Sequence, residues 1–235
     1  MIALPQIRPS YDSAYSIPLQ SVDTPVPSSV SALLEIVGGL TATTKMPGPS
    51  YSISAFRCNV GGRLRSVEGS TCSRCYACKG NYTRFPSVQA ALERRYRSLS
   101  DPRWTAAMAA IIQRRGYRWF RWHDSGDLQS ANHLANIVSV ARACPETSFW
   151  LPTREYGLID AAGEFPANLR VRVSAHLQDR AAPARFSHTS RVASHSGSAA
   201  LDGAWACPAP SQGGRCGECR ACWSSAVPAV VYHVH

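Results

Sequence analysis

The sequence predicts an α/β fold, either a partial (βα) barrel or an open, mostly parallel sheet. Apolar residues recur with helical spacing in three segments, 86–99, 102–116 and 130–144. Short stretches rich in β-branched and aromatic residues lie between these segments, and cysteine-rich loops or polar residues follow them. Such alternation is typical of βαβ units, whose right-handed crossovers align the carboxyl ends of the strands. We therefore expect the cysteine-rich loops at the carboxyl ends of the strands.

The chain divides by composition near residue 50. Residues 1–50 are rich in Pro, Ser and Thr, and we expect an arm whose only apolar run, 30–40, forms a helix or a strand. Residues 51–235 are expected to form a single α/β metal-binding domain.

One strand and two helices are expected in the first part of that domain. "YSISAFRC" (51–58) has the composition of a strand, and a cysteine loop follows it. The next amphipathic segment carries a proline in its first turn, where helices accept it. Helix 102–116 is expected to be capped by Ser100 or Asp101 and to end at Gly116.

The second part continues the alternation. Strands are expected at 117–123 and 147–153, on either side of helix 130–144. Segment 168–176 alternates apolar residues with two arginines, which predicts a strand with one apolar and one polar face. A loop-rich region, 178–226, follows, and "AVVYHVH" forms a last strand.

Composition limits the class of protein. The chain has 235 residues, is 45% hydrophobic and contains no apolar stretch long enough to span a membrane. The first residues lack the pattern of a secretion signal, so we expect a cytoplasmic protein without a membrane partner. The net charge is +10, and every basic residue except Lys45 and Lys79 is an arginine. This charge suits a nucleic-acid partner, but it also fits an ordinary basic surface.

The strongest signal is the cysteine pattern. Two C-x2-C-x2-C combs, in "STCSRCYACKG" and "GGRCGECRACW", each gain a fourth cysteine from nearby sequence. The first thiol group comprises Cys58, Cys72, Cys75 and Cys78. The second thiol group comprises Cys207, Cys216, Cys219 and Cys222. Reduced cysteines at this spacing are typical of [4Fe–4S] ligands.

Two other assignments remain open at this point. Zinc also accepts four cysteines, although two C-x2-C pairs would suffice for it. Alternatively, both combs share one cluster. The ninth cysteine, Cys144, lies on the apolar face of a helix and is expected to be a core residue.

Four motifs together resemble the phage gene product 88 family. They are "STCSRCYACKGNY", "FRWHDSGDLQS", "WLPTREY" and "GGRCGECRACW", within roughly residues 45–224. The resemblance implies a phage or prophage origin, and thus the cytoplasm of the host cell. It also implies an iron–sulfur or other metal site.

The layout is also similar to that of radical S-adenosylmethionine enzymes. In those enzymes a cluster loop follows the first strand and a Gly-rich motif follows the second. The corresponding motif here, Ser125, Gly126 and Asp127, would contact S-adenosylmethionine. However, those enzymes use C-x3-C-x2-C, and a fourth ligand at Cys58 would leave no iron open for the cofactor.

Polar side chains after two strands are candidates for acid–base or substrate-binding work. These are His123, Asp124, Asp127, Arg154 and Glu155. The structural alternative is that Asp127 or Ser130 caps helix 130–144 and that Arg154 pairs with a nearby acid. Three further histidines in polar, loop-like sequence, His176, His188 and His195, could act as ligands, although isolated histidines are usually solvated. His233 and His235 lie in the last strand and carry no motif.

Three functional hypotheses follow. The first is an iron–sulfur protein in redox or radical chemistry, with a small-molecule substrate or a redox partner. The second is a nucleic-acid-binding protein whose clusters are structural. The third is a zinc-binding interaction module.

Overall fold

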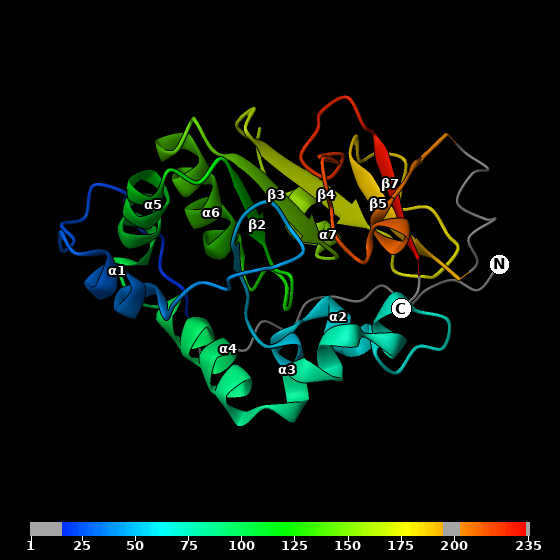
Figure 1. Ribbon diagram of the computed structural model, residues 1–235, viewed down its shortest axis with the longest axis horizontal. Helices are drawn as coiled ribbons and strands as arrows, with labels where there is room; N and C mark the ends of the chain where they lie inside the picture. Colours follow the sequence, from blue (N-terminus) through cyan, green and yellow to red (C-terminus); the bar gives the residue numbers. More distant parts are fainter. Residues whose placement is uncertain (1–15, 195–202, 234–235) are drawn as a thin grey trace.

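The computed structural model describes residues 16–194 and 203–233 (Figure 1). The predictions that involve His195, His235 and residues 1–15 lie outside this part of the chain. The α-helices are α1 (Val30–Val37), α2 (Val60–Leu64), α3 (Asn81–Arg84), α4 (Pro86–Ser98), α5 (Trp104–Arg115), α6 (Ala131–Ala143) and α7 (Tyr156–Asp160). The 3-10 helices are η1 (Ala55–Arg57), η2 (Thr71–Arg74), η3 (Tyr76–Cys78) and η5 (Ala209–Gln212). The strands are β1 (Ser50–Tyr51), β2 (Trp119–Trp122), β3 (Ser148–Thr153), β4 (Leu169–Ser174), β5 (Thr189–Ala193), β6 (Trp205–Ala206) and β7 (Ala229–His233).

The described strands form one open sheet in the order β1-β2-β3-β4-β5-β7-β6, and every pairing is parallel. The predicted α/β class is therefore confirmed, in its open-sheet rather than its barrel form. Because all strands run the same way, their carboxyl ends lie along one edge of the sheet. In Figure 1 the segment that carries α2 and α3 forms a separate layer below the sheet.

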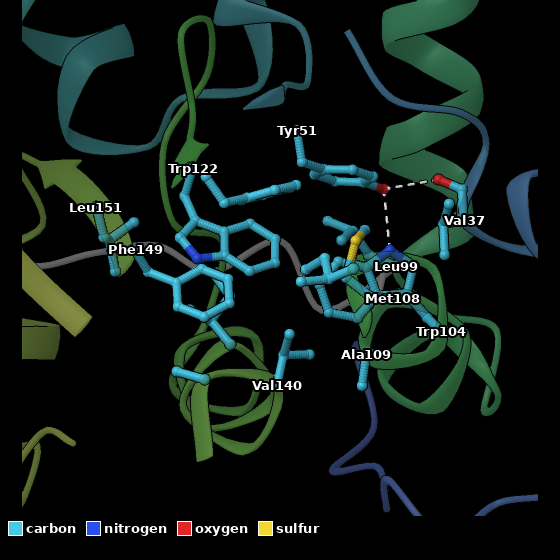
Figure 2. Packing of buried hydrophobic residues seen from close by; sticks show 14 of the residues in the cluster. Val37, Tyr51, Leu99, Trp104, Met108, Ala109, Trp122, Val140, Phe149 and Leu151 are labelled. Atoms are coloured by element: carbon cyan, nitrogen blue, oxygen red, sulfur yellow. Dashed lines mark hydrogen bonds between the residues drawn. The ribbon is translucent and has the colours of Figure 1, made fainter. Parts of the chain in front are cut away.

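Helices α5 and α6 cover one face of the sheet and form the main core with it (Figure 2). Trp122 and Phe149 project from β2 and β3 into this core, and both are fully buried. Two of the buried polar groups there are paired, since Trp104 Nε1 donates to the Tyr51 hydroxyl (3.0 Å), which in turn donates to the Val37 carbonyl (3.1 Å). The indole N–H of Trp122 has no hydrogen-bond partner among the described residues. The opposite face of the sheet is covered by the loop before β7, as described below.

Residues 16–50 pack onto the same core. The apolar run 30–40 forms a helix, α1, which ends at Gly38 in the left-handed conformation (φ 74°). Leu33 and Val37 of this helix are fully buried, and Ile17 joins them in the core.

Strand 51–58 is much shorter than predicted. Only its first residue extends into β1, because the side chain of Ser54 accepts a hydrogen bond from the Phe56 N–H and starts η1. The helix predicted at 102–116 begins two residues late, at Trp104. The Asp101 carboxylate does not cap that helix by the expected route, since it binds the N–H and guanidinium of Arg103.

Helix α6 begins as one of the two alternatives predicted. The Ser130 hydroxyl accepts a hydrogen bond from the His133 N–H (3.1 Å) and is the N-cap. Asp127 is engaged elsewhere. Cys144, just after this helix, is buried in the core as expected.

Two strands lie in the region predicted to be loop. β5 has the polar sequence Thr-Ser-Arg-Val-Ala, but it pairs with β4 on one side and β7 on the other. β6 is a two-residue edge strand. In both cases long-range pairing overrides a composition that does not resemble a strand. The final strand, β7, is confirmed through residue 233.

Acid stability is expected to depend on His133, which is completely buried in α6. Burial lowers the pKa of this imidazole from 6.5 to about 3. Below about pH 6.5 the imidazole of the unfolded chain binds a proton, whereas that of the folded chain stays neutral down to about pH 3. Stability is therefore lost as the pH falls from 6.5 toward 3. We expect His133→Asn, whose side-chain oxygen can still accept the Gln129 N–H, to be less stable at pH 7. Its urea midpoint should fall less steeply between pH 6.5 and 4. An unchanged slope would contradict this assignment.

Candidate metal centre

The first thiol group lies beyond the carboxyl end of β1, on short helical turns. Cys72, Cys75 and Cys78 follow one another on η2 and η3, where the N–H of each later cysteine donates to the carbonyl of the one before (3.2 Å). In a 3-10 turn residues three apart lie directly above one another. Each turn thus brings two of the cysteines close together, and Cys75, where the two turns meet, has a non-helical ψ (119°).

The segment is held against the rest of the sheet. The Thr71 N–H donates to the His176 carbonyl just after β4 (2.9 Å), and Ser70 forms an isolated bridge with Leu177. The comb therefore spans the distance from the tip of β1 to the tip of β4.

Cys58 completes this group from the end of η1. A side chain at Gly61 would stand 3.4 Å from the sulfur of Cys72 and 3.7 Å from that of Cys58. The two sulfurs thus converge on the space beside a glycine. Burial raises the pKa of both thiols above the ordinary value, so a thiolate here needs a compensating positive charge.

Arg154, just after β3, lies among these thiols. Although burial opposes its charge, the nearby Cys72 and Asp127 raise the pKa of this guanidinium above its ordinary value. In return Arg154 partly offsets the effect of burial on the pKa of Cys72. Within residues 16–194 and 203–233 its Nε atom has no hydrogen-bond partner and Arg154 forms no ion pair. The alternative in which Arg154 forms an ion pair with a nearby acid is therefore not observed among these residues. The guanidinium lies near the thiols of Cys58, Cys72 and Cys75 instead.

Asp127 and Glu155 lie beside the same space. Asp127 accepts three hydrogen bonds, from the Thr153 hydroxyl (2.6 Å) and from the Leu128 and Arg154 N–H groups (2.8 and 2.9 Å). It thus joins the tips of β2 and β3 rather than capping α6. Glu155 accepts the Val60 N–H (2.9 Å), and burial, with Asp127 nearby, raises the pKa of its carboxyl to about 8.

Asp124 clasps the cysteine segment to the tip of β2. Its carboxylate accepts from the hydroxyls of Ser50 (2.6 Å) and Tyr82 (2.8 Å), and its carbonyl accepts from the hydroxyl of Tyr76. Tyr76 stands between Cys75 and Cys78. The structure therefore gives Asp124 a positioning role that spacing alone did not reveal.

The remaining candidates after β2 point elsewhere. His123 has a positive φ (55°), and its ring packs edge-on against His133 in the helical layer (5.4 Å between centroids). Burial lowers the pKa of His123 well below its ordinary value. Gly126 packs tightly on Ile53, whose N–H donates to the Ser125 carbonyl (3.2 Å). These contacts give "SGD" a structural role, and its binding of S-adenosylmethionine stays a prediction.

The second thiol group follows β6 and crosses the sheet face opposite the helices. Cys207 comes directly after β6, and its N–H donates to the Val231 carbonyl (2.9 Å). Cys222 Sγ lies 3.2 Å from the Tyr232 hydroxyl. Burial raises the pKa of Cys222 to about 11. Among the described residues, Cys207 is electrostatically coupled to Cys216, Cys219 and Cys222, and none of them to the first group. The thiols thus fall into two groups of four.

Arg172 on β4 holds the loop of this second group. Its guanidinium donates to the carbonyls of Ala221 (2.6 Å), Cys222 (2.9 Å), Ser224 (3.0 Å) and Val227 (2.9 Å). The side chain is completely buried. The alternation in 168–176 predicted a polar face here, and that face is covered by a loop about 50 residues further along. No pattern near Arg172 in the sequence signals this contact.

Trp223 closes the loop over β2. Its Nε1 donates to the Phe120 carbonyl (3.0 Å), and its ring packs against Trp119 and Trp150. Arg121 lies on the same face with its guanidinium 4.2 Å from the Trp150 ring centre. Its charge acts on Tyr76 of the first comb and on Cys222 of the second. The two thiol groups therefore flank one arginine- and tryptophan-lined face.

The chemistry of both groups suits a soft metal centre. Four cysteine sulfurs that form no disulfide are the donor set that iron–sulfur clusters and zinc prefer. In the described part of the chain, however, no three Cys, His, Asp or Glu side chains are positioned to hold a single metal ion.

Comparison with known proteins settles the family. The model of the family described as gene product 88 matches residues 40–225. The chain belongs to the gene product 88 family. This match confirms the resemblance read from the four motifs. The matched residues include both thiol groups. No curated protein and no solved structure matches it significantly, and the likeness to radical S-adenosylmethionine enzymes gains no support.

No helix in the described residues of this gene product 88 protein has the length and apolar character needed to cross a bilayer. This agrees with the absence of long apolar stretches in the sequence.

Proposed function

We propose that this gene product 88 protein is an iron–sulfur protein whose first thiol group holds a [4Fe–4S] cluster. The observation that carries the proposal is the partly buried Arg154 guanidinium, which lies among Cys58, Cys72 and Cys75, has no hydrogen-bond partner for its buried Nε and forms no ion pair among the described residues. A buried charge without a partner is costly. Asp127 supplies part of the compensating negative charge, and thiolates that bind a metal would supply more of it.

The arrangement of the sulfurs favours a cluster over zinc. A tetrahedral zinc site with bonds of about 2.3 Å brings four sulfurs within about 4 Å of one another. No triad of that kind exists among the described side chains. A cubane cluster separates its ligands further, because each cysteine binds a different iron. The space beside Gly61, on which Cys58 and Cys72 converge, lies between such ligands.

A bound cluster of this type supplies one-electron transfer. The chain's own residues would set the conditions for it. Arg154 offsets the negative charge of the thiolates, Asp124 fixes the comb through Tyr76 and Tyr82, and the partly buried position of Cys58 limits the access of water. The second thiol group would hold a second cluster in the same way. Thiols of this kind need a reducing compartment, which is the cytoplasm of the host cell for a phage protein.

Metal analysis of protein prepared without oxygen tests the proposal. We expect a brown protein with iron and acid-labile sulfide, about four of each per occupied thiol group. Cys72→Ser should remove the iron of one group, whereas Cys144→Ser, which changes a buried cysteine of the core, should retain all of it. A colourless protein with stoichiometric zinc, or one with neither iron nor sulfide after reconstitution, would overturn the proposal.

Gly61→Ala provides a finer test of the same site. The added methyl group would stand 3.1 Å from Cys58 Cβ and 3.4 Å from the Cys72 sulfur, inside the space between two ligands. Gly62→Ala is the matched control, because nothing lies within 4 Å of its added Cβ. Both substitutions are at α-helical positions without positive φ, so both should fold. We expect Gly61→Ala alone to lower the iron content of the first group at least about two-fold. Equal iron in the two variants would place the cluster away from Gly61.

A further inference from the structure

The surface around the first comb carries exposed aromatic rings as well as positive charge. The described residues include five exposed large hydrophobic side chains, and three of them, Phe56 (59%), Tyr76 (48%) and Phe85 (45%), lie between residues 55 and 85. Large apolar side chains gathered at one exposed place mark an interaction site more often than scattered ones do. Here they sit on η1, η3 and the end of α3.

These elements are neighbours in space. η1 packs against η3, and η3 packs against α3, so the three exposed rings lie on adjoining elements. Figure 1 shows the same segment as a layer that stands apart from α5 and α6. We call this surface the comb face and define it by its exposed side chains, Phe56, Arg74, Tyr76, Lys79, Arg84 and Phe85.

The comb face is strongly positive. Residues 55–85 contain six basic side chains and one acidic side chain, Glu68. Arg74, Lys79 and Arg84 are exposed, and none of them forms an ion pair within the described residues. The nearest buried acid, Asp124, is covered by the hydroxyls of Tyr76 and Tyr82.

Two of the exposed rings carry a guanidinium over one face. Arg65 lies 5.0 Å from the centre of the Phe56 ring, and Arg84 lies 5.7 Å from that of Phe85. Exposed aromatic rings with arginine beside them can stack on the bases of a nucleic acid, while the cations neutralise the phosphates of its backbone. An acidic peptide would use the charges but would leave the exposed rings without a function.

We propose that the comb face binds single-stranded nucleic acid, by stacking of bases on Phe56 and Phe85 and by contact of phosphates with Arg74, Lys79 and Arg84. Single strands are required because a duplex hides the faces of its bases. This inference does not depend on the cluster, since every residue of the comb face except Tyr76 lies outside the contacts of Arg154 and Asp124 described above.

Fluorescence anisotropy with a labelled oligodeoxythymidine of 20 nucleotides tests the proposal, on the full chain before and after reconstitution with iron and sulfide. Three phosphate contacts predict a slope of log K against log salt near −2, since each contact on a single strand contributes about −0.7. The double variant Arg74→Ala/Lys79→Ala should make this slope less steep by about 1.4. Phe56→Ala/Phe85→Ala should weaken binding by at least about 30-fold, since each base that loses its stacking partner contributes about 5-fold or more, and it should leave the slope unchanged.

Two control variants separate a specific surface from general charge. Arg142→Ala removes an exposed cation from α6, and Trp205→Ala removes an exposed ring from β6; neither should change binding more than about two-fold. No binding at low salt would overturn the proposal. So would equal affinity of all variants, or competition by polyglutamate as effective as by unlabelled single strand. Because binding is measured with and without iron, a failure here leaves the iron analysis of the preceding section intact.

Discussion

Arg172→Met is expected to lower the free energy of unfolding by at least about 3 kcal/mol and to release the loop of the second thiol group. The substitution keeps the apolar stem but removes the guanidinium donors to the carbonyls of Ala221, Cys222, Ser224 and Val227. The Ala221 carbonyl keeps one other donor, the Ser224 N–H (3.2 Å). Each buried carbonyl left without a donor costs about 1–3 kcal/mol. Met also cannot replace the fork geometry with which one guanidinium spans four carbonyls.

Arg172→Lys should be intermediate, because an ammonium has three donors on one nitrogen and reaches fewer of these carbonyls. Arg170→Met is the matched control on the same face of β4. Its guanidinium approaches only His188 at 3.4–3.5 Å among the described residues, so the cost should stay below about 1 kcal/mol. Urea unfolding measures the free energies, and the rate at which Cys222 reacts with a thiol reagent reports release of the loop. An Arg172→Met protein as stable as Arg170→Met would show that the loop is held by other contacts.

Arg172 also shows where sequence reasoning stops. The alternation of Leu169, Val171 and Val173 with two arginines correctly predicts β4 and its core-facing residues. The same pattern places Arg172 on the polar face of the strand. It does not indicate that this face is buried, whereas in the fold a loop covers it. The loop residues that bind Arg172 lie 49 or more positions later in the chain, and no local periodicity indicates such a contact.

The strands that the sequence predicted differ in one physical respect from those that it missed. β2 and β3 carry aromatic residues such as Phe120 and Phe149, which are fully buried. Aromatic residues are enriched in strands, so the composition of these segments predicts a strand. β5 consists mainly of polar residues, and its place in the sheet comes from the backbone hydrogen bonds of its two neighbours. A strand stabilised chiefly by pairing leaves little trace in composition.

The candidate site follows the same division. Spacing suggested two sets of four thiols but left open a single cluster shared by both combs, and among the described residues the thiols of each set lie near one another. Spacing could not show that Asp124 holds Tyr82, that Glu155 binds the Val60 N–H, or that Arg154 enters the thiol group. Those contacts join residues that lie 42 or more positions apart in the chain, and only the assembled sheet brings them together.

Gly126→Ala is expected to destabilise the fold by several kcal/mol, although the sequence motif first suggested a cofactor contact. Gly126 has φ +85°, which a residue with a Cβ adopts only at a cost of about 1 kcal/mol. The added methyl group would also overlap Ile53 Cγ1 and stand 2.9 Å from the Ile53 carbonyl oxygen. This overlap is relieved only if the tips of β1 and β2 move apart. Overpacking of this kind costs a further 1–3 kcal/mol, roughly.

Gly163→Ala is the matched control, because Gly163 is exposed and nothing lies within 4 Å of its added Cβ. Its unfolding free energy should stay within about 0.5 kcal/mol of the parent protein. The pair also separates the two roles considered for Gly126. Since Ile53 leads into η1 and Cys58, a structural role predicts that Gly126→Ala loses stability and iron together, with or without S-adenosylmethionine. A variant that unfolds like the parent protein but fails to bind S-adenosylmethionine would instead restore the cofactor role, because a steric clash with Ile53 cannot act on the cofactor while sparing the strand tips.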